Sequence, residues 1–239
     1  NGKKYYFSPT NGKMETGKKT ISHYICYFSE KGVLLRKIDK NKKMVALTYD
    51  DGPSIYTPRI LKTLKENNSV ATFFVVGNRV PMYSDTVKKA YDMGCEIGNH
   101  TYEHKSLPNL SETEVKRQIS KTNKEVKKAI GEKPVIMRPT GGATNNNIKK
   151  WVGMPSIIWS VDTLDWKTRN ADSTRRAVLN RVKDGDIVLM HDLYSATATA
   201  SETIIPELVR RGYQLVTVSE LAECRDGMKE TGAYYSFRK

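Results

Sequence analysis

Apolar residues between positions 43 and 224 gather in short runs that are separated by longer amphipathic stretches. The runs are continuous rather than alternating, which is typical of parallel strands that are covered on both faces. They predict seven buried strands at Met44–Thr48, Val70–Val76, Cys95–Gly98, Val135–Met137, Ile157–Val161, Ile187–Met190 and Gln214–Val218. The alternation of strand and helix favours an α/β fold, as a parallel barrel or a doubly wound sheet.

Capping and turn residues mark the helices between these strands. We expect helix starts at Thr57-Pro58, at the capping box Ser111-x-x-Glu114, and at Asp172 or Ser173. The helix that follows Ser111 should end at Gly131, and a later helix, Ser201–Arg211, should end at Gly212.

The first 42 residues have a different pattern, in which short aromatic segments alternate with glycine turns. Tyr6-Phe7-Ser8 recurs as Tyr27-Phe28-Ser29, 21 residues later, which predicts a short segment of repeated β-hairpins. The segment resembles the repeats of choline- and glucan-binding cell-wall proteins. Two units are fewer than a repeat array needs, so we expect a remnant rather than a working sugar-binding module. We therefore divide the chain into residues 1–42, a main domain at 43–224, and a polar C-terminal tail at 225–239.

The formal net charge of +14 is distributed unevenly. Residues 1–43 contain 11 Lys and Arg against 3 Asp and Glu. This excess indicates either an anionic partner, such as a cell wall or a nucleic acid, or a solubilising surface. No run of 18 apolar residues predicts a membrane span, and no signal peptide is visible at Asn1.

The three cysteines, Cys26, Cys95 and Cys224, are widely spaced and form no CxxC pair, which excludes a structural zinc ribbon. An odd number also excludes a fully paired set of intramolecular disulfides. Cys95 lies in a predicted strand, so we expect a buried free thiol there. Pairing of Cys26 with Cys224 stays open.

Polar residues follow five of the predicted strands directly. The segments are Asp50-Asp51-Gly52-Pro53, Asn99–His104, Arg138–Gly142, Asp162–Trp166 and His191-Asp192. In an α/β barrel the C-terminal ends of the strands meet on one face, which is where catalytic groups lie. We therefore expect these segments to form one site.

Three of the four histidines belong to this set. His100 and His104 are four residues apart, so on a helical turn both imidazoles face the same way. Two histidines and one carboxylate, from Asp50 or Asp51, form a common catalytic zinc set. Each piece alone has a structural explanation, such as a turn, a surface helix or a core histidine. Their joint occurrence at strand ends favours a catalytic metal site over these structural explanations.

The five segments, in this order, resemble the five motifs of the NodB-homology polysaccharide deacetylases, carbohydrate esterase family 4. The resemblance covers Lys43 to Cys224 and implies a distorted (β/α)7 barrel. It also implies that Asp51, His100 and His104 bind a divalent metal, with zinc expected and cobalt or nickel as alternatives. The metal would act as a Lewis acid and hold the attacking water.

The same resemblance assigns the proton-transfer roles. Asp50 corresponds to the general base, and Arg138 to the arginine that pairs with it. His191 corresponds to the general acid that protonates the leaving amine, and Asp165 to the carboxylate that orients this histidine.

Three further positions correspond to the pocket. Gly141 stands where the family has a tyrosine whose backbone N–H contributes to the oxyanion hole, and glycine keeps that donor. Trp166 and Leu189 correspond to the apolar walls around the acetyl methyl group. The missing tyrosine side chain alters the pocket wall.

The implied function is removal of N-acetyl groups from a polysaccharide, with peptidoglycan N-acetylglucosamine as the expected substrate. Chitin oligomers, N-acetylmuramic acid and, as an ester substrate, acetylated xylan are the alternatives. A non-catalytic wall-binding protein is the different class, and the complete motif set argues against it. We expect a bacterial, extracellular or cell-surface protein that contacts the anionic wall and binds no nucleic acid.

Overall fold

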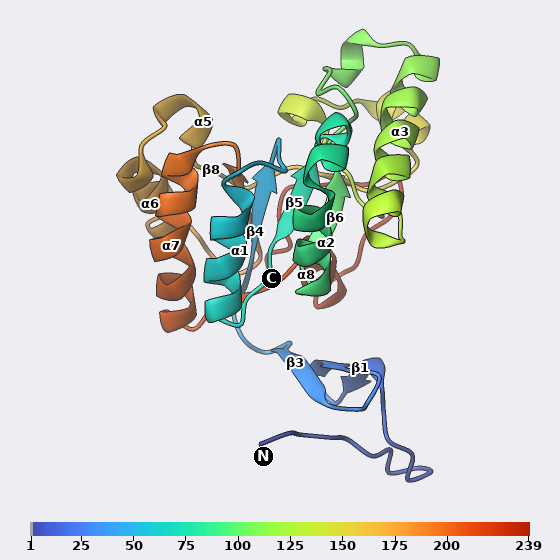
Figure 1. Cartoon of the computed structure of the whole chain (residues 1–239), viewed down its shortest axis with the longest axis vertical. Coiled ribbons are helices and arrows are strands. Elements are labelled where there is room, and N and C mark those ends of the chain that lie inside the picture. Colours follow the sequence, from blue (N-terminus) through green and yellow to red (C-terminus); the bar gives the residue numbers. More distant parts are fainter. Residues whose placement is uncertain (1) are drawn as a thin grey trace. The chain divides into compact units, whose positions relative to one another are not determined.

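The structure is a computed structural model that describes residues 2–239, and the chain divides after Lys43 into two compact units (Figure 1). The first unit contains an antiparallel sheet of three strands, β1 (Gly17–Ile21), β2 (Tyr24–Phe28) and β3 (Leu34–Asp39). Ile25, Cys26, Phe28 and Ile38 are its buried side chains. The expected aromatic repeats therefore fall partly in this sheet, since Tyr27-Phe28 ends β2.

The second unit, Met44–Lys239, contains the remaining strands and all helices of the described chain. Its strands are β4 (Met44–Asp50), β5 (Thr72–Val75), β6 (Glu96–Asn99), β7 (Ser156–Ile157), β8 (Val161–Asp162), β9 (Asp186–His191), β10 (Gln214–Leu215) and β11 (Ala233–Tyr234). Its α-helices are α1 (Thr57–Glu66), α2 (Ser84–Asp92), α3 (Glu112–Ile130), α4 (Asn146–Val152), α5 (Asp165–Thr168), α6 (Ala171–Leu179), α7 (Ser195–Arg210) and α8 (Val218–Glu223). Short 3-10 segments lie at Gly77–Tyr83, Leu107–Asn109 and Thr140–Gly142.

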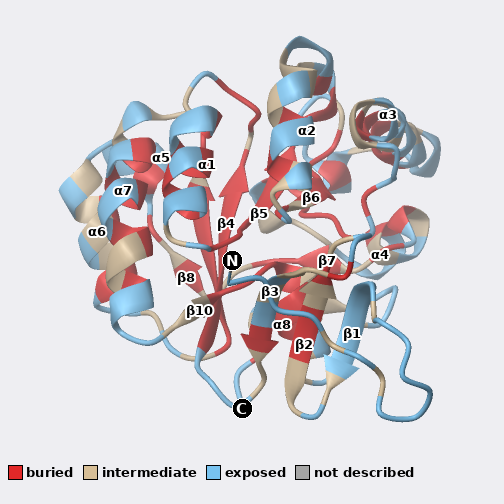
Figure 2. Ribbon diagram, turned by 60° about the horizontal axis from the view of Figure 1, so that its bottom comes forward, coloured by how far each residue is buried: buried red, intermediate tan, exposed pale blue. Residues whose placement is uncertain are grey.

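The central sheet is parallel, in the order β6-β5-β4-β9-β8, and β10 also pairs with β4. Every residue of β4 is buried, as expected for a central strand (Figure 2). Met137 bridges Asn99 on one side and Ser156 on the other, so the sheet continues past β6 to β7. Residues 156–162 then lead from β7 to β8 and link the two edges of the sheet. The expected α/β class with a distorted (β/α)7 barrel is confirmed.

Three predicted strands differ from the observed ones. Val135–Met137 forms only isolated bridges at Met137. Ile157–Val161 is not one strand but a break between β7 and β8, because its two ends pair with different neighbours. Gln214–Val218 is strand only to Leu215, since Val218 begins α8 behind a capping box of Thr217 and Glu220.

The predicted helix ends are right for α3, for the start of α1 at Thr57 and for the end of α7 before Gly212, and they are wrong for the starts of α6 and α7. Ser111 accepts a hydrogen bond from Glu114 N, and Gly131 ends the helix with a φ of 86°. The N-cap of α6 is Asn170 rather than Asp172 or Ser173. Helix α7 begins at Ser195, six residues before the predicted start, because small residues in its first turns hid the helical period.

The last fifteen residues pack on the second unit. β11 pairs with β7, Ser236 bridges Asp186, and Phe237 is buried. Residues 225–239, expected as a separate polar tail, therefore extend the main unit. The three cysteines form no disulfide within residues 2–239, and Cys95 is buried as predicted.

Helices α1 and α7 pack together on one side of β4, and α2 packs beside α3 near β5 and β6 (Figure 1). The polar segments predicted from the sequence follow the C-terminal ends of the central strands, beyond the parts that these helices cover. Among the described residues, none of the helices has both the length and the apolar character needed to cross a bilayer.

Candidate active site

The register of the central sheet brings two candidate catalytic residues together. β4 pairs with β9 so that Asp50 lies opposite His191, each at the last position of its strand. Opposed residues of neighbouring parallel strands point to the same side of the sheet. The two residues are about 140 positions apart in the sequence, but the pairing of β4 with β9 places them next to each other.

Asp50 is held by a buried arginine. Its Oδ1 accepts a hydrogen bond from Arg138 Nη1 at 2.7 Å, and both side chains are almost fully buried. Arg138 also donates to Thr48 Oγ1 and to the carbonyl oxygens of Ile157 and Ile158. A buried charge needs this degree of pairing. Asp50 is therefore fixed in one orientation, with Oδ2 directed toward the imidazole of His100 at 3.7 Å.

Asp51, His100 and His104 converge on one point. Their ligand atoms all lie within 4.8 Å of one another, with Asp51 Oδ1 at 3.3 Å from His100 Nε2 and 2.9 Å from His104 Nε2. Asp51 Oδ1 is buried and makes no hydrogen bond of normal geometry with any residue that the structure describes. Although burial alone would raise it, the two imidazoles hold the pKa of Asp51 well below its usual range. One carboxylate and two histidines with an orphaned oxygen between them fit a divalent cation.

The loop that carries the two histidines is not helical, so the predicted helical turn is wrong. Thr101 and His104 have left-handed backbone, with φ of 63° and 55°. Gln118 on α3 holds the loop, because its Oε1 accepts hydrogen bonds from the backbone N–H groups of Tyr102 and Glu103. Gln118 Nε2 in turn donates to the carboxylates of Glu103 and Glu114. The histidines face the same way through this loop and not through helical spacing.

Asn99 supports the same loop from its other end. Its Oδ1 accepts a hydrogen bond from Thr101 N, and its Nδ2 donates to Ile119 O and Asn123 Oδ1 on α3. His100 Nδ1 lies 2.7 Å from Arg138 O, which sets the ring so that Nε2 faces Asp51. The sequence placed Asn99 in a candidate segment but gave it no role, and it gave no indication of Gln118, since a polar residue on a helix gives no local sign of its partners.

His191 is paired with Asp165. The two are joined by Nδ1 and Oδ1 at 2.8 Å, and Asp165 Oδ2 accepts from His191 N and Thr197 Oγ1. Burial alone would lower the pKa of His191. The hydrogen bond and charge of Asp165 outweigh that effect and raise the pKa to about 9. His191 is therefore a cation at neutral pH, with Nε2 left to donate a proton.

Asp192 is a second carboxylate that the sequence did not single out. It is buried, Thr57 Oγ1 donates to its Oδ2, and its Oδ1 has no hydrogen-bond partner among residues 2–239. Burial raises its pKa to about 7. Its carboxylate fills the space where a side chain at Gly52 would begin, so only glycine fits beside Asp51 at that position.

The three predicted pocket residues lie in different elements, Gly141 in a 3-10 segment, Trp166 in α5 and Leu189 in β9. Gly141 has a φ of 63° and open space at its Cβ position. The segment after Arg138 therefore exposes backbone groups at Gly141, with no side chain beside them. Trp166 follows Asp165, donates its backbone N–H to that carboxylate, and is 46% exposed. Leu189 is buried in β9, and its carbonyl accepts from Thr163 Oγ1.

The comparisons with known proteins agree with this geometry. The family model for polysaccharide deacetylases matches residues 37–153. A family 4 acetyl xylan esterase from Clostridium thermocellum, solved with a cobalt ion, is 33% identical with a TM-score of 0.78. The alignment covers 82% of this chain and 100% of that one.

The chain belongs to the polysaccharide deacetylase family. A peptidoglycan-N-acetylglucosamine deacetylase from Listeria monocytogenes is 45% identical over 76% of this chain. A peptidoglycan-N-acetylmuramic acid deacetylase from Bacillus subtilis is 41% identical over 79% of this chain. The chain spans only 39% and 40% of the length of these two deacetylases.

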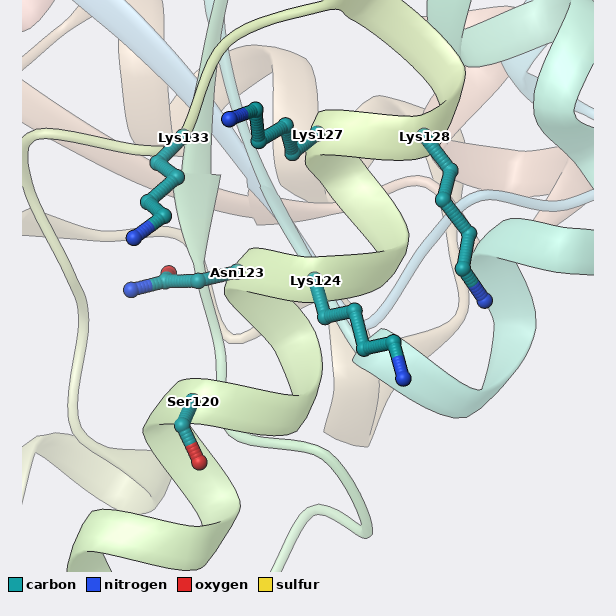
Figure 3. A pocket seen from close by; sticks show the side chains of 6 residues that line it. All are labelled: Ser120, Asn123, Lys124, Lys127, Lys128 and Lys133. Atoms are coloured by element: carbon teal, nitrogen blue, oxygen red, sulfur yellow. The ribbon is translucent and has the colours of Figure 1, made fainter.

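A basic groove lies along α3, on another part of this deacetylase-family unit (Figure 3). It has a volume of about 580 Å³ and is lined by Ser120, Asn123, Lys124, Lys127, Lys128 and Lys133. Lys128 pairs with Glu125, whereas Lys124, Lys127 and Lys133 form no ion pair within residues 2–239. The groove adjoins the loop of the histidines through the bond between Asn123 and Asn99.

Proposed function

We propose that this chain is a metal-dependent deacetylase that removes N-acetyl groups from peptidoglycan, with N-acetylglucosamine as the foremost substrate. The observation that carries the proposal is the convergence of Asp51, His100 and His104 between two proton-transfer pairs, Asp50–Arg138 and His191–Asp165. The peptidoglycan deacetylases among the relatives support the choice of substrate.

Asp51, His100 and His104 would hold the cation, for which zinc is proposed because a histidine and carboxylate set suits it. When bound, a divalent cation supplies a Lewis acid that polarises a carbonyl and makes water more acidic. The cobalt ion of the Clostridium thermocellum esterase is consistent with a divalent metal in this family.

The residues of the chain supply the proton transfers. Arg138 occupies Oδ1 of Asp50, so Oδ2 is the atom that takes the proton from the attacking water. Carbonyl attack creates an oxyanion, toward which the backbone N–H of Gly141 is proposed to donate. His191 then gives its Nε2 proton to the nitrogen as the C–N bond breaks, while Asp165 stabilises the imidazolium.

The charged state of His191 favours an amide over an ester as the scissile bond. An amine leaves poorly as an anion, so an amidase depends on a protonated acid more than an esterase does. With a pKa raised to about 9, His191 keeps that proton across the neutral range. Acetyl xylan remains the alternative substrate because relatives with this fold act on it.

Acetate release separates these activities. Chelator-stripped protein and protein reloaded with zinc, cobalt or nickel are incubated with peptidoglycan, chitotetraose and acetylated xylan. We expect release from the two N-acetylated glycans only after metal is restored. Release from xylan alone would make the chain an esterase, and metal-loaded protein inactive on all three would contradict the proposal.

From its positive charge, we propose that the protein lies at the bacterial cell surface, in contact with an anionic wall polymer. Basic residues outnumber acidic ones in residues 1–43, and four lysines line the groove along α3. The chain should sediment with purified walls and be released by salt at a few hundred millimolar, since exposed charges are screened. Sedimentation that is unchanged by salt would exclude this mode of contact.

A further inference from the structure

One cationic side chain beside the proton donor has no part in the mechanism above. Arg169 follows α5, and its guanidinium carbon lies 4.9 Å from the centroid of the Tyr194 ring. The Tyr194 ring centroid in turn lies 6.3 Å from that of His191. The guanidinium of Arg169 and the imidazole of His191 are therefore both neighbours of the Tyr194 ring.

The charge of Arg169 is not compensated by the protein. Within residues 2–239 its guanidinium forms no ion pair and no hydrogen bond, and its side chain is exposed. Arg175 on the following helix is different, because it pairs with Asp172 at 3.2 Å. Arg169 thus presents all of its N–H donors to whatever occupies the mouth of the site.

The backbone around Arg169 is fixed in an uncommon conformation. Leu164 and Arg169, which flank α5, both have left-handed backbone, with φ of 53° and 45°. Arg169 N donates to Asp165 O at 2.8 Å, which ties it to the residue that orients His191. Strained non-glycine residues of this kind persist where a site depends on their position.

We propose that Arg169, stacked on Tyr194, is a subsite that binds a carboxylate of the glycan next to the acetamide being hydrolysed. This inference rests on the proposed function and deepens it. A guanidinium presents parallel N–H donors that match a carboxylate. In peptidoglycan, the lactyl ether on O3 of muramic acid ends in a carboxyl group, and the stem peptides carry further carboxylates. Chitin has neither.

The test compares kcat/KM on four soluble substrates. Two are the peptide-free muramyl tetrasaccharide with free lactyl carboxylates and its lactyl methyl ester. The third is the same glycan with stem peptides, whose lactyl groups are amides, and the fourth is chitotetraose. We expect the wild-type protein to prefer a carboxylate-bearing substrate over the neutral ester by about tenfold, mainly through KM. Preference for the free lactyl acid identifies the lactyl group, and preference confined to the peptide-bearing glycan identifies the stem.

Arg169→Gln should remove that preference and leave kcat/KM on chitotetraose within about twofold, which also shows that the variant is folded. Arg169→Lys should keep part of the preference, because lysine retains the positive charge but lacks the parallel N–H donors of the guanidinium. Arg175→Gln is the matched control, a neighbouring arginine whose loss should change no ratio.

Two results with the Arg169→Gln variant would overturn the subsite. One is an equal loss on chitotetraose and on the carboxylate-bearing glycans, and the other is a wild-type preference that survives Arg169→Gln. Wild-type protein that releases acetate from chitotetraose but shows no preference rejects the subsite alone. Metal-loaded protein that is inactive on all four substrates rejects the proposed function as well.

Discussion

The two halves of the site are built differently. The proton-transfer half consists of Asp50–Arg138 and His191–Asp165, in which Asp50 and His191 end paired strands and every charge meets an opposite one. The metal-ligand half consists of Asp51, His100 and His104, which lie in loops, two of them with left-handed backbone. Strand ends fix the first half, whereas side chains from α3 fix the second.

The difference shows which half depends on a ligand. Asp165 and Arg138 each make several hydrogen bonds within the protein itself, so the proton-transfer half is held in place without a ligand. Asp51 keeps a buried oxygen without a hydrogen bond. An unsatisfied buried acceptor costs about 1–3 kcal/mol, so a cation there both offsets that cost and stabilises the loop.

Asp50→Asn should have the largest effect, because it removes the base and leaves the metal ligands in place. We expect kcat on chitotetraose to fall by about 10³-fold or more. Metal affinity, measured by competition with a chromophoric chelator, should stay within about threefold of the wild-type value. A parallel loss of metal affinity would mean that the two halves are not separable.

His104→Asn tests the metal-ligand half by removing one ligand. Asparagine tolerates the left-handed backbone that His104 adopts, so the loop should keep its shape. We expect metal affinity to fall by more than about 100-fold, the upper end of the effect of losing an outer partner. Unchanged affinity in the chelator competition would remove His104 from the ligand set.

Asp165→Asn returns to the proton-transfer half. Without the carboxylate, the pKa of His191 should fall from about 9, so the alkaline limb of the kcat profile should move to lower pH. At pH 8 we expect kcat to fall by roughly 10- to 100-fold, with metal affinity unchanged. A pH profile that keeps its alkaline limb near 9 would contradict the assignment of His191 as the acid.

The raised pKa of His191 also predicts how stability depends on pH. The folded pKa lies above the unfolded value, so the pair with Asp165 stabilises the fold fully below about pH 6.5. This contribution is lost as the pH rises through about 9. Wild-type protein should therefore lose more stability over that interval than Asp165→Asn, as followed by denaturant unfolding.

The same division explains what the sequence could predict. The long apolar runs of β4, β5 and β9 identify the central strands, and the polar residues that follow them are adjacent in sequence to those strands. Asp50 and His191 could therefore be predicted from the sequence pattern. Segments that make few strand pairs, such as the one with isolated bridges at Met137, carry too little apolar pattern to be placed correctly.

The supports of the metal-ligand half could not be predicted, because they depend on contacts between distant segments. The spacing of His100 and His104 suggests a helical turn, but the structure uses a loop with left-handed residues. Gln118 lies on the inner face of α3 among Val115, Ile119 and Thr122, and its role appears only when the helix packs against the loop. The sequence likewise gives no sign of a role for Arg169, because its contact with Tyr194 appears only in the structure.

Gln118→Met should have the smallest effect of the four substitutions, and it tests one set of contacts specifically. It keeps an unbranched side chain in the same buried space but leaves the backbone N–H groups of Tyr102 and Glu103 without an acceptor. The loop should then lose its fixed shape, and metal affinity should fall by about tenfold. Activity at saturating metal should largely recover, because Asp50 and His191 are untouched.

Ser120→Ala, an exposed change on the same helix, is the control and should alter neither quantity. A general packing defect from Gln118→Met would lower kcat at every metal concentration, including saturation. An effect confined to metal affinity would instead show that α3 acts on catalysis through the loop of the two histidines. That outcome would make the metal-ligand half the one in which distant parts of the sequence are coupled to activity.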